Sequence, residues 1–166
     1  MKTPVEIPEF EAVREALASY WRGRQRLREL GVLRSDRSVH GDFAEWLVCQ
    51  MFGFQIAASG VKEGFDARDG LGNTYQVKAR IVKRLEQPTS FDMKDPGHPF
   101  DFLMGVFLTD SAEVLGIIRV PYQEVLARAR INVGRRSFRW TKAMLKEPWI
   151  EFLYRRPDSL GGTSAA

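Results

Sequence analysis

Two residues that could bind a cation, Asp66 and Gln76, lie on either side of a short turn, and a lysine, Lys78, follows Gln76 by two residues. The turn is rich in Asp, Gly and Asn, and the flanking runs alternate apolar with polar residues, which predicts a β-hairpin. With the turn centred on Leu71, Asp66 faces Gln76 across the two strands, with Cβ atoms about 5 Å apart. Side chains alternate between the faces of a strand, so the three polar residues share one face. A carboxylate, an amide oxygen and an ammonium group on one face predict a cation site with a lysine beside it.

Glu45 is a second carboxylate of interest, and it lies on a predicted helix. Apolar residues recur at helical spacing over residues 39–52, Ser38 is a candidate N-cap, and Gly53 ends the pattern. The helix is predicted to be largely buried, with Glu45 at the edge of its apolar stripe. A carboxylate in that place is either a surface residue or a metal ligand, and taken alone the surface interpretation is favoured.

The remaining pattern predicts an α+β fold, α/β/α-like in its layers, with a mixed central sheet flanked by helices. Residues 100–108 are almost continuously apolar, which is typical of a central strand covered on both faces. In chain order the pattern predicts a helix over 8–30, a helix over 39–52, a strand over 54–58, the hairpin over 64–82, a loop over 87–99, strands over 100–108 and 113–119, a helix from Pro121 to about Ala129, a short strand over 137–140, a short helix over 141–147, and a last strand with Trp149, Ile150, Phe152 and Leu153. No internal repeat or linker divides the chain, so one globular domain is expected.

Three short motifs carry a resemblance to a known family. They are Gly41-Asp42-Phe43-Ala44-Glu45 on the helix, Gly64-Phe65-Asp66-Ala67 on the hairpin, and Tyr75-Gln76-Val77-Lys78 on its second strand. Together they resemble the PD-(D/E)XK nuclease superfamily over roughly residues 38–130, with Gln76 in place of the commoner acid. The resemblance implies a restriction-endonuclease-like domain over 38–157, after a helical extension over 1–37 and before a disordered tail over 158–166.

This resemblance also implies a metal-dependent site for phosphodiester hydrolysis. Asp66 would be the central ligand of a Mg²⁺ ion, and Gln76 and the backbone carbonyl of Val77 would complete part of its shell. Glu45 would bind the metal directly or through water, and Lys78 would orient the attacking water or stabilise charge on the phosphate. Because Gln76 is neutral, we expect a single metal site with Mn²⁺ as an alternative to Mg²⁺, and an inactive member of the superfamily stays open.

Each residue of the proposed site also has a purely structural interpretation. Asp66 could bond backbone amides near the turn. Gln76 could be an ordinary cross-strand neighbour, and Lys78 could belong to the solvent face of an edge strand. Taken one at a time these interpretations are favoured, whereas taken together with Glu45 the residues favour a nuclease-type site.

The net charge of +4 is unevenly distributed, with basic stretches over 21–37, 78–84 and 135–156. A solvated helix face explains the first stretch best, but three stretches together suit the phosphate backbone of a nucleic acid, DNA in the first instance. The candidate phosphate contacts are Lys62, Arg80, Lys83 and Arg84, with Arg34 and Arg37 as weaker candidates.

The sequence predicts a cytoplasmic protein that does not enter a membrane. No apolar run is long enough to cross a bilayer, and the residues after Met1 lack the apolar core of a signal peptide. Cys49 is the only cysteine, so an internal disulfide is excluded and a reducing compartment is favoured.

The leading hypothesis is a Mg²⁺-dependent endodeoxyribonuclease. Two alternatives stay open, namely an inactive nucleic-acid-binding module of the same fold and a dimerising interaction protein. A homodimer could use aromatic residues near the C-terminus, although core packing is their default interpretation. These residues are Trp140, Trp149, Phe152 and Tyr154.

Overall fold

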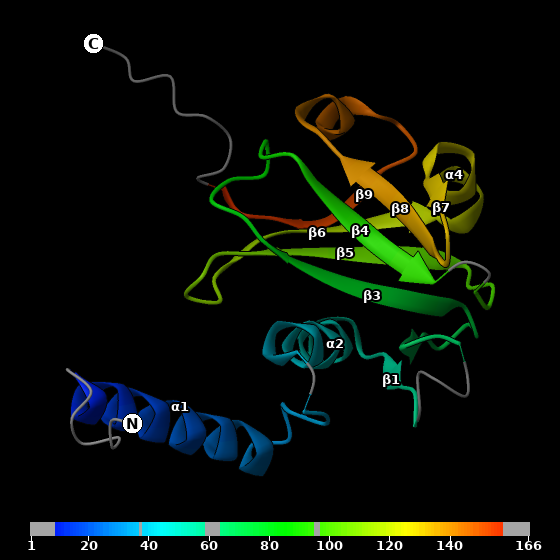
Figure 1. Ribbon diagram of the computed structural model, residues 1–166. Helices are drawn as coiled ribbons and strands as arrows, with labels where there is room; N and C mark the ends of the chain where they lie inside the picture. The colour runs from blue at the N-terminus through cyan, green and yellow to red at the C-terminus, as the bar shows by residue number, and fades with distance from the viewer. Residues whose placement is uncertain (1–8, 37, 59–63, 95–96, 158–166) are drawn as a thin grey trace.

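The computed structural model describes residues 9–36, 38–58, 64–94 and 97–157, whose arrangement is shown in Figure 1. The elements in chain order are α1 (Phe10–Glu29), α2 (Val39–Phe52), β1 (Gln55–Ile56), β2 (Ala67–Arg68), β3 (Thr74–Ile81), β4 (Thr89–Lys94), β5 (Phe102–Leu108), β6 (Val114–Pro121), α4 (Tyr122–Arg128), β7 (Arg130–Asn132), β8 (Arg135–Trp140), the 3₁₀-helix η2 (Lys142–Lys146) and β9 (Glu151–Arg155). This mixture of helices and strands confirms the predicted α+β class.

Helix α2 has the predicted bounds because both of its ends carry clear signals. The Ser38 hydroxyl accepts the backbone N–H of Gly41 at 3.1 Å, which caps the first turn. Gly53 follows the last turn with a φ of 67°, a left-handed conformation that glycine adopts without strain. These two ends fix the phase of the helix and therefore the place of Glu45 in its second turn.

A six-stranded sheet forms the centre of the molecule, in the order β1-β2-β3-β5-β6-β9. β3 and β5 are parallel and the other neighbours are antiparallel, so the sheet is mixed as predicted. The hairpin of β2 and β3 has the predicted register, with Ala67 opposite Tyr75. Asp69 organises its turn, because Oδ1 accepts the backbone N–H groups of Leu71 and Asn73, each at 2.9 Å.

Each face of the central sheet has its own apolar core. On one face, α2 packs against β3 and β5, and Val48, Tyr75 and Met104 are fully buried there. On the other face, β4, β8 and β7 form a second sheet, in that order, whose Phe91 and Trp140 are buried against the central strands. Figure 1 shows α2 below the central strands and β4 with β8 across from it. These two layers hold β3 between them.

The prediction of a loop over 87–99 is wrong, because β4 lies within it and pairs with β8 along its length. Phe91 is fully buried on one face of β4, whereas Ser90 and Asp92 lie on the other. Pro88 directly before the strand, and further prolines after it, are turn signals that obscure this alternation. The far face of the central sheet is therefore covered mainly by a second sheet, a layer that the sequence did not predict.

The aromatic residues near the C-terminus belong to the core rather than to a free surface. Trp140 is fully buried, and its indole Nε1–H donates to the carbonyl of Leu85 at 2.7 Å. Trp149 and Phe152 pack against the same cluster. Core packing, the default interpretation of these residues, is therefore confirmed for them.

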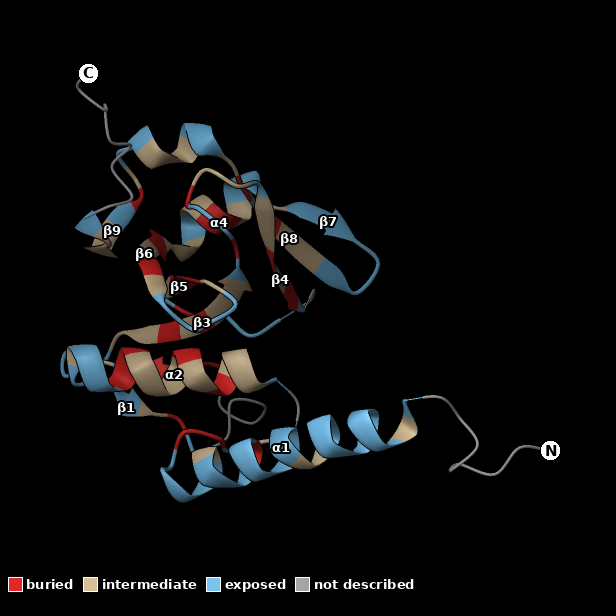
Figure 2. Cartoon of the chain, turned by 90° about the vertical axis from the view of Figure 1, so that its left-hand side faces the viewer, coloured by how far each residue is buried: buried red, intermediate tan, exposed pale blue. Residues whose placement is uncertain are grey.

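Helix α1 lies beside α2 and away from the central sheet (Figure 1). Arg24 is its only buried residue, and Figure 2 shows exposed surface along most of its length. The helix predicted over 8–30 is thus present, but its large apolar side chains Val13, Leu17, Tyr20 and Trp21 are exposed. Within the part of the chain that the structure describes, no helix combines the length and apolar character needed to span a membrane.

Candidate functional site

Asp66 lies where the two strands of the hairpin separate. The residue directly precedes β2, whereas β3 runs on from Gln76 to Ile81 without a β2 partner. The backbone N–H of Asp66 donates to the carbonyl of Tyr75 at 2.8 Å, and its carbonyl accepts the N–H of Ala57 at 2.9 Å. The backbone on both sides therefore fixes Asp66 at the open edge of β3.

The Asp66 carboxylate covers part of this open edge. Its Oδ2 accepts the backbone N–H of Val77 at 2.8 Å and also the side-chain amide of Gln76. Its Oδ1 has no hydrogen-bond partner among the described residues. The N–H and C=O of one residue point to the same side of a strand, so the Val77 carbonyl faces the same edge. A carboxylate oxygen and a backbone carbonyl are thus directed to one place.

Gln76 differs from its predicted role in one respect. It lies opposite Asp66, as the register predicted. Its side-chain NH₂ group donates a hydrogen bond to the Asp66 carboxylate, whereas the prediction had its side-chain oxygen beside that carboxylate as a second metal ligand. In this arrangement Gln76 orients the carboxylate as a cross-strand neighbour, which is one of the two interpretations that the sequence left open.

Glu45 projects from α2 toward the same region, and its side chain is 24% exposed. Burial raises the pKa of its carboxyl to about 7, and the negative charges of Asp66 and Asp42 add to this effect. The positive charges of Arg34 and Lys78 oppose it. The pKa of Asp66 is raised as well, chiefly by burial, although the Val77 N–H and Lys78 favour its charged form. The site therefore holds two carboxylates that are costly to ionise.

Lys78 shares the face of Gln76 on β3, two residues further along the strand. Its ammonium group has no hydrogen-bond or ion-pair partner within the described residues, although its charge acts on both Glu45 and Asp66. Gly105 is its neighbour across the parallel pair of β3 and β5. Phe91 and Ile118 pack closely against Gly105, since a Cβ there would lie 2.8 Å from Cζ of Phe91 and 2.9 Å from Cγ1 of Ile118.

Asp42 and Arg34 brace the site, and the sequence gave Asp42 no role. The Asp42 carboxylate is nearly buried and accepts the backbone N–H groups of Arg34 at 2.8 Å and Ser35 at 2.7 Å. Arg34 donates through Nη2 to the carbonyl of Ala57 at 2.7 Å, and its Nη1 lies 3.8 Å from the Glu45 carboxylate. Arg34, a candidate phosphate contact, thus serves as an internal brace. The signal for Asp42 was its position in the first turn of α2, one turn before Glu45.

The other candidate phosphate contacts divide into three groups. Arg80 joins β3 to β4, since it donates to the carbonyl of Ser90 and lies 3.4 Å from the Asp92 carboxylate. Lys83 and Arg84 follow β3 and are exposed. Within the described segments, the side chain of neither residue has a hydrogen-bond or ion-pair partner. Lys62 and Arg37 lie outside the described residues.

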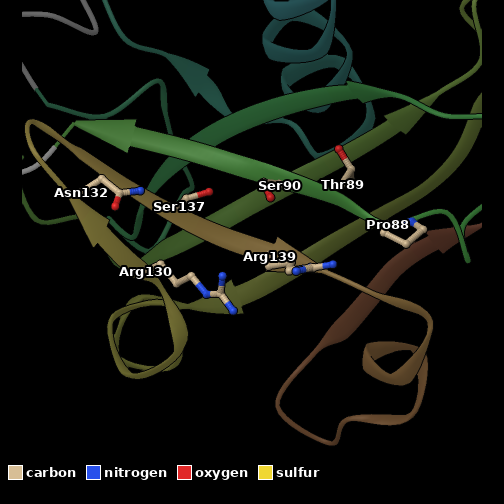
Figure 3. A pocket seen from close by; sticks show the side chains of 7 residues that line it. All are labelled: Pro88, Thr89, Ser90, Arg130, Asn132, Ser137 and Arg139. Carbon is tan, nitrogen blue, oxygen red and sulfur yellow. The ribbon is translucent and has the colours of Figure 1, made fainter.

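A cleft of about 370 Å³ lies on the outer face of the second sheet, and Figure 3 shows the side chains that line it. Ser90 on β4 is opposite Arg139 on β8, and Ser137 on β8 is opposite Arg130 on β7. Among the described residues, these four side chains have no hydrogen-bond or ion-pair partner. The lining residues are Pro88, Thr89, Ser90, Arg130, Asn132, Ser137 and Arg139. The sequence did not predict this cleft, because β4, which supplies Ser90, is distant in the chain from β7 and β8, which supply the two arginines.

The donor set at the open edge of β3 has two carboxylates, and this limits how it could hold a metal. No group of three or more His, Cys, Asp or Glu side chains that could hold a metal ion occurs in the described ranges. The oxygens that suit a hard cation are Oδ1 of Asp66, the carbonyl of Val77 and the Glu45 carboxylate. A single cation among them would relieve the repulsion between the two carboxylates.

Comparison with known proteins gives no independent identity. No protein-family model and no curated protein matches this chain. The functional assignment therefore depends on the chemistry of the residues at the open edge of β3 and on the cleft of the second sheet.

Proposed function

We propose that this protein is a metal-dependent nuclease that hydrolyses DNA phosphodiester bonds on a restriction-endonuclease-like core. The observation that carries the proposal is the gathering of Asp66, Glu45 and Lys78 at the open edge of β3. Two carboxylates beside an unpaired ammonium group suit a reaction in which negative charge develops on a phosphate.

Asp66, Val77 and Glu45 would hold one Mg²⁺ or Mn²⁺ ion at this edge. The observation in favour is that Asp66 Oδ1 has no protein donor while both carboxylates are costly to ionise without a cation. When bound, such an ion supplies Lewis acidity and lowers the pKa of its water. Gln76 contributes no charge, so the attraction for a hard cation is weaker than with a third carboxylate.

The chain's own residues provide orientation and charge. The positive charge of Lys78 acts on both carboxylates, and at this position its ammonium group would stabilise negative charge on the phosphate. Arg34 holds the Glu45 side chain in place through its guanidinium group. The Val77 N–H and the Gln76 amide together fix the plane of the Asp66 carboxylate.

The nucleic-acid backbone would use the cleft of the second sheet as well as the exposed side chains of Lys83 and Arg84. Arg130 and Arg139 are at diagonal positions on neighbouring strands, and such Cβ atoms lie about 7–8 Å apart. Hydrogen-bond donors from Ser90 and Ser137 lie beside the two guanidinium groups. Two arginines with hydroxyl groups and no acid in the lining suit phosphate groups.

Cleavage of plasmid and branched DNA with Mg²⁺ or Mn²⁺ tests the catalytic proposal. We expect Asp66→Asn and Lys78→Ala each to lower the cleavage rate at least about 100-fold, because each removes charge at the reacting phosphate. Asp110→Asn and Lys142→Ala are matched controls, because both residues are exposed and distant in the fold from this edge. Equal cleavage by the Asp66 variant and its control would contradict the proposal.

A non-catalytic nucleic-acid-binding module is the second candidate function, and the Gln76 amide bonded to Asp66 is the observation that favours it. Binding of a labelled oligonucleotide in EDTA separates the two functions. The slope of log K for binding against log salt concentration should become shallower in the double variant Arg130→Gln with Arg139→Gln. We expect a change of about 1.4 for single-stranded DNA, or about 0.7 for each lost phosphate contact. Arg22→Gln with Arg26→Gln on α1 removes the same charge away from the cleft. Specific loss of binding in the cleft variant, without cleavage by the intact protein, would support the second candidate.

A further inference from the structure

Helix α1 carries an apolar face that the described part of the chain leaves largely uncovered. Four of its large side chains are about half exposed, namely Val13 at 54%, Leu17 at 53%, Tyr20 at 49% and Trp21 at 58%. Leu17 follows Val13 by four residues, and Tyr20 and Trp21 follow Leu17 by three and four, so all four lie on one side of the helix. A run of large apolar side chains of this kind on an exposed helix marks an interaction surface.

The isolation of α1 points the same way. Most helices in proteins are stabilised by packing an apolar face rather than by helix propensity. Among the described residues, Arg24 and Arg28 near the C-terminal end of α1 both contact Asp36, which ties that end to the segment that follows. Figures 1 and 2 show the helix extending away from the body of the protein beyond that end. The remaining length therefore needs a packing surface from elsewhere.

We propose that the apolar face of α1, defined as Val13, Leu17, Tyr20 and Trp21, binds the same face of a second copy in an antiparallel helix pair. The charges of α1 favour this partner and this direction. Its first half has a net charge of −1, from Glu11 and Glu15 against Arg14, whereas its second half has a net charge of +3, from four arginines against Glu29. An antiparallel pair places the acidic half of each helix beside the basic half of the other, whereas a parallel pair places like charges together.

Self-association also explains why the apolar face is centred on Leu17. In a two-fold pair centred on this residue, Leu17 meets its own copy, and Val13 meets Trp21 of the second copy. One helix face per protomer is a small interface, so we expect a dimer that dissociates on dilution into the micromolar range. This inference is independent of nuclease activity.

Sedimentation equilibrium over a range of protein concentrations tests the proposal. Leu17→Glu places a charge at the centre of the pair and is expected to weaken dimerisation at least about tenfold. Ser19→Glu adds the same charge on the opposite side of α1, where Ser19 is exposed beside Arg22, and is expected to leave dimerisation unchanged. Glu is a good helix former in both variants, and circular dichroism checks that each is folded. A monomer at all concentrations, or equal dimerisation by the intact protein and the Leu17 variant, would overturn the proposal.

Disulfide trapping tests the direction of the pair in a Cys49→Ala background, since Cys49 is the only native cysteine. Leu17→Cys is expected to form a covalent dimer on mild oxidation. Phe10→Cys is not, because in the antiparallel pair the two positions lie about 21 Å apart along the helix axes. Efficient trapping through Phe10→Cys would show a parallel pair and refute the proposed geometry. Dimerisation that Leu17→Glu does not affect would place the interface elsewhere.

Discussion

Replacing Glu45 with Gln is expected to stabilise the metal-free protein at pH 8. Burial, followed by the charges of Asp66 and Asp42, raises the pKa of Glu45 from 4.5 to about 7 in the folded protein. One pKa unit corresponds to about 1.4 kcal/mol, so ionised Glu45 costs the fold about 3 kcal/mol. The Glu45 side chain is only 24% exposed, so water screens this cost little.

The sign of the effect follows from where the proton is bound more tightly. A carboxyl group with a raised pKa favours the folded state below its unfolded pKa, and this contribution is lost as the pH rises through the folded value. For Glu45 the loss runs from about pH 4.5 to about pH 7. Gln resembles the protonated acid, so the variant and the intact protein should have similar stability near pH 4. The variant should gain its full advantage by about pH 8.

Thermal unfolding in EDTA, followed by circular dichroism, measures this difference. About 3 kcal/mol corresponds to an increase in Tm of roughly 6–12 °C for a chain of this size. Glu15→Gln on the exposed surface of α1 is the control and should change Tm little at either pH. If the contact between Arg34 and Glu45 outweighed burial, the Glu45 variant would melt lower than the intact protein at pH 8. That result would refute the reasoning.

Two further substitutions test the framework around the site. Gly105→Ala should destabilise the fold by about 1–3 kcal/mol in urea unfolding, because a Cβ there lies 2.8 Å from Cζ of the buried Phe91. Gly70→Ala, whose Cβ meets no atom within 4 Å, should cost far less, and equal losses would contradict the packing explanation. Asp42→Asn should cost about 1.5–3 kcal/mol at pH 7, because a charged acceptor of two backbone N–H groups is lost. It should also lower the pKa of Glu45. The loss of stability that accompanies ionisation of Glu45 as the pH rises should then be complete at a lower pH than in the intact protein, which pH-dependent unfolding would measure.

The parts of the fold that the sequence predicted well are those with strong local signals. The turn residues around Asp69 set the register of the hairpin, so the position of Asp66 opposite Gln76 followed from the chain alone. Ser38 and Gly53 similarly set the ends of α2. The second sheet could not be predicted in the same way, because it joins β4 to the β7–β8 hairpin, which is distant from it in the chain, and β4 is flanked by prolines.

Charge patterns predicted the basic residues but not their partners. Arg34 and Arg80 were candidate phosphate contacts, and the structure engages both with backbone carbonyls and carboxylates of the chain itself. Arg130 and Arg139 lie in the cleft on the two strands of the β7–β8 hairpin, which the sequence did not predict. A sequence shows that a guanidinium group is present, whereas only the fold shows whether another group already binds it.

Stability and proposed function meet at the open edge of β3. Burial makes both Glu45 and Asp66 harder to ionise, and the charge of Asp66 makes Glu45 harder still. Lys78 opposes this effect at both carboxylates but does not cancel it. A fold that served stability alone would place neutral side chains there, since a buried carboxylate without full compensation destabilises the native state. Among the described residues, Oδ1 of Asp66 and the ammonium group of Lys78 have no hydrogen-bond or ion-pair partner, and we propose that a cation and a phosphate would supply the missing compensation.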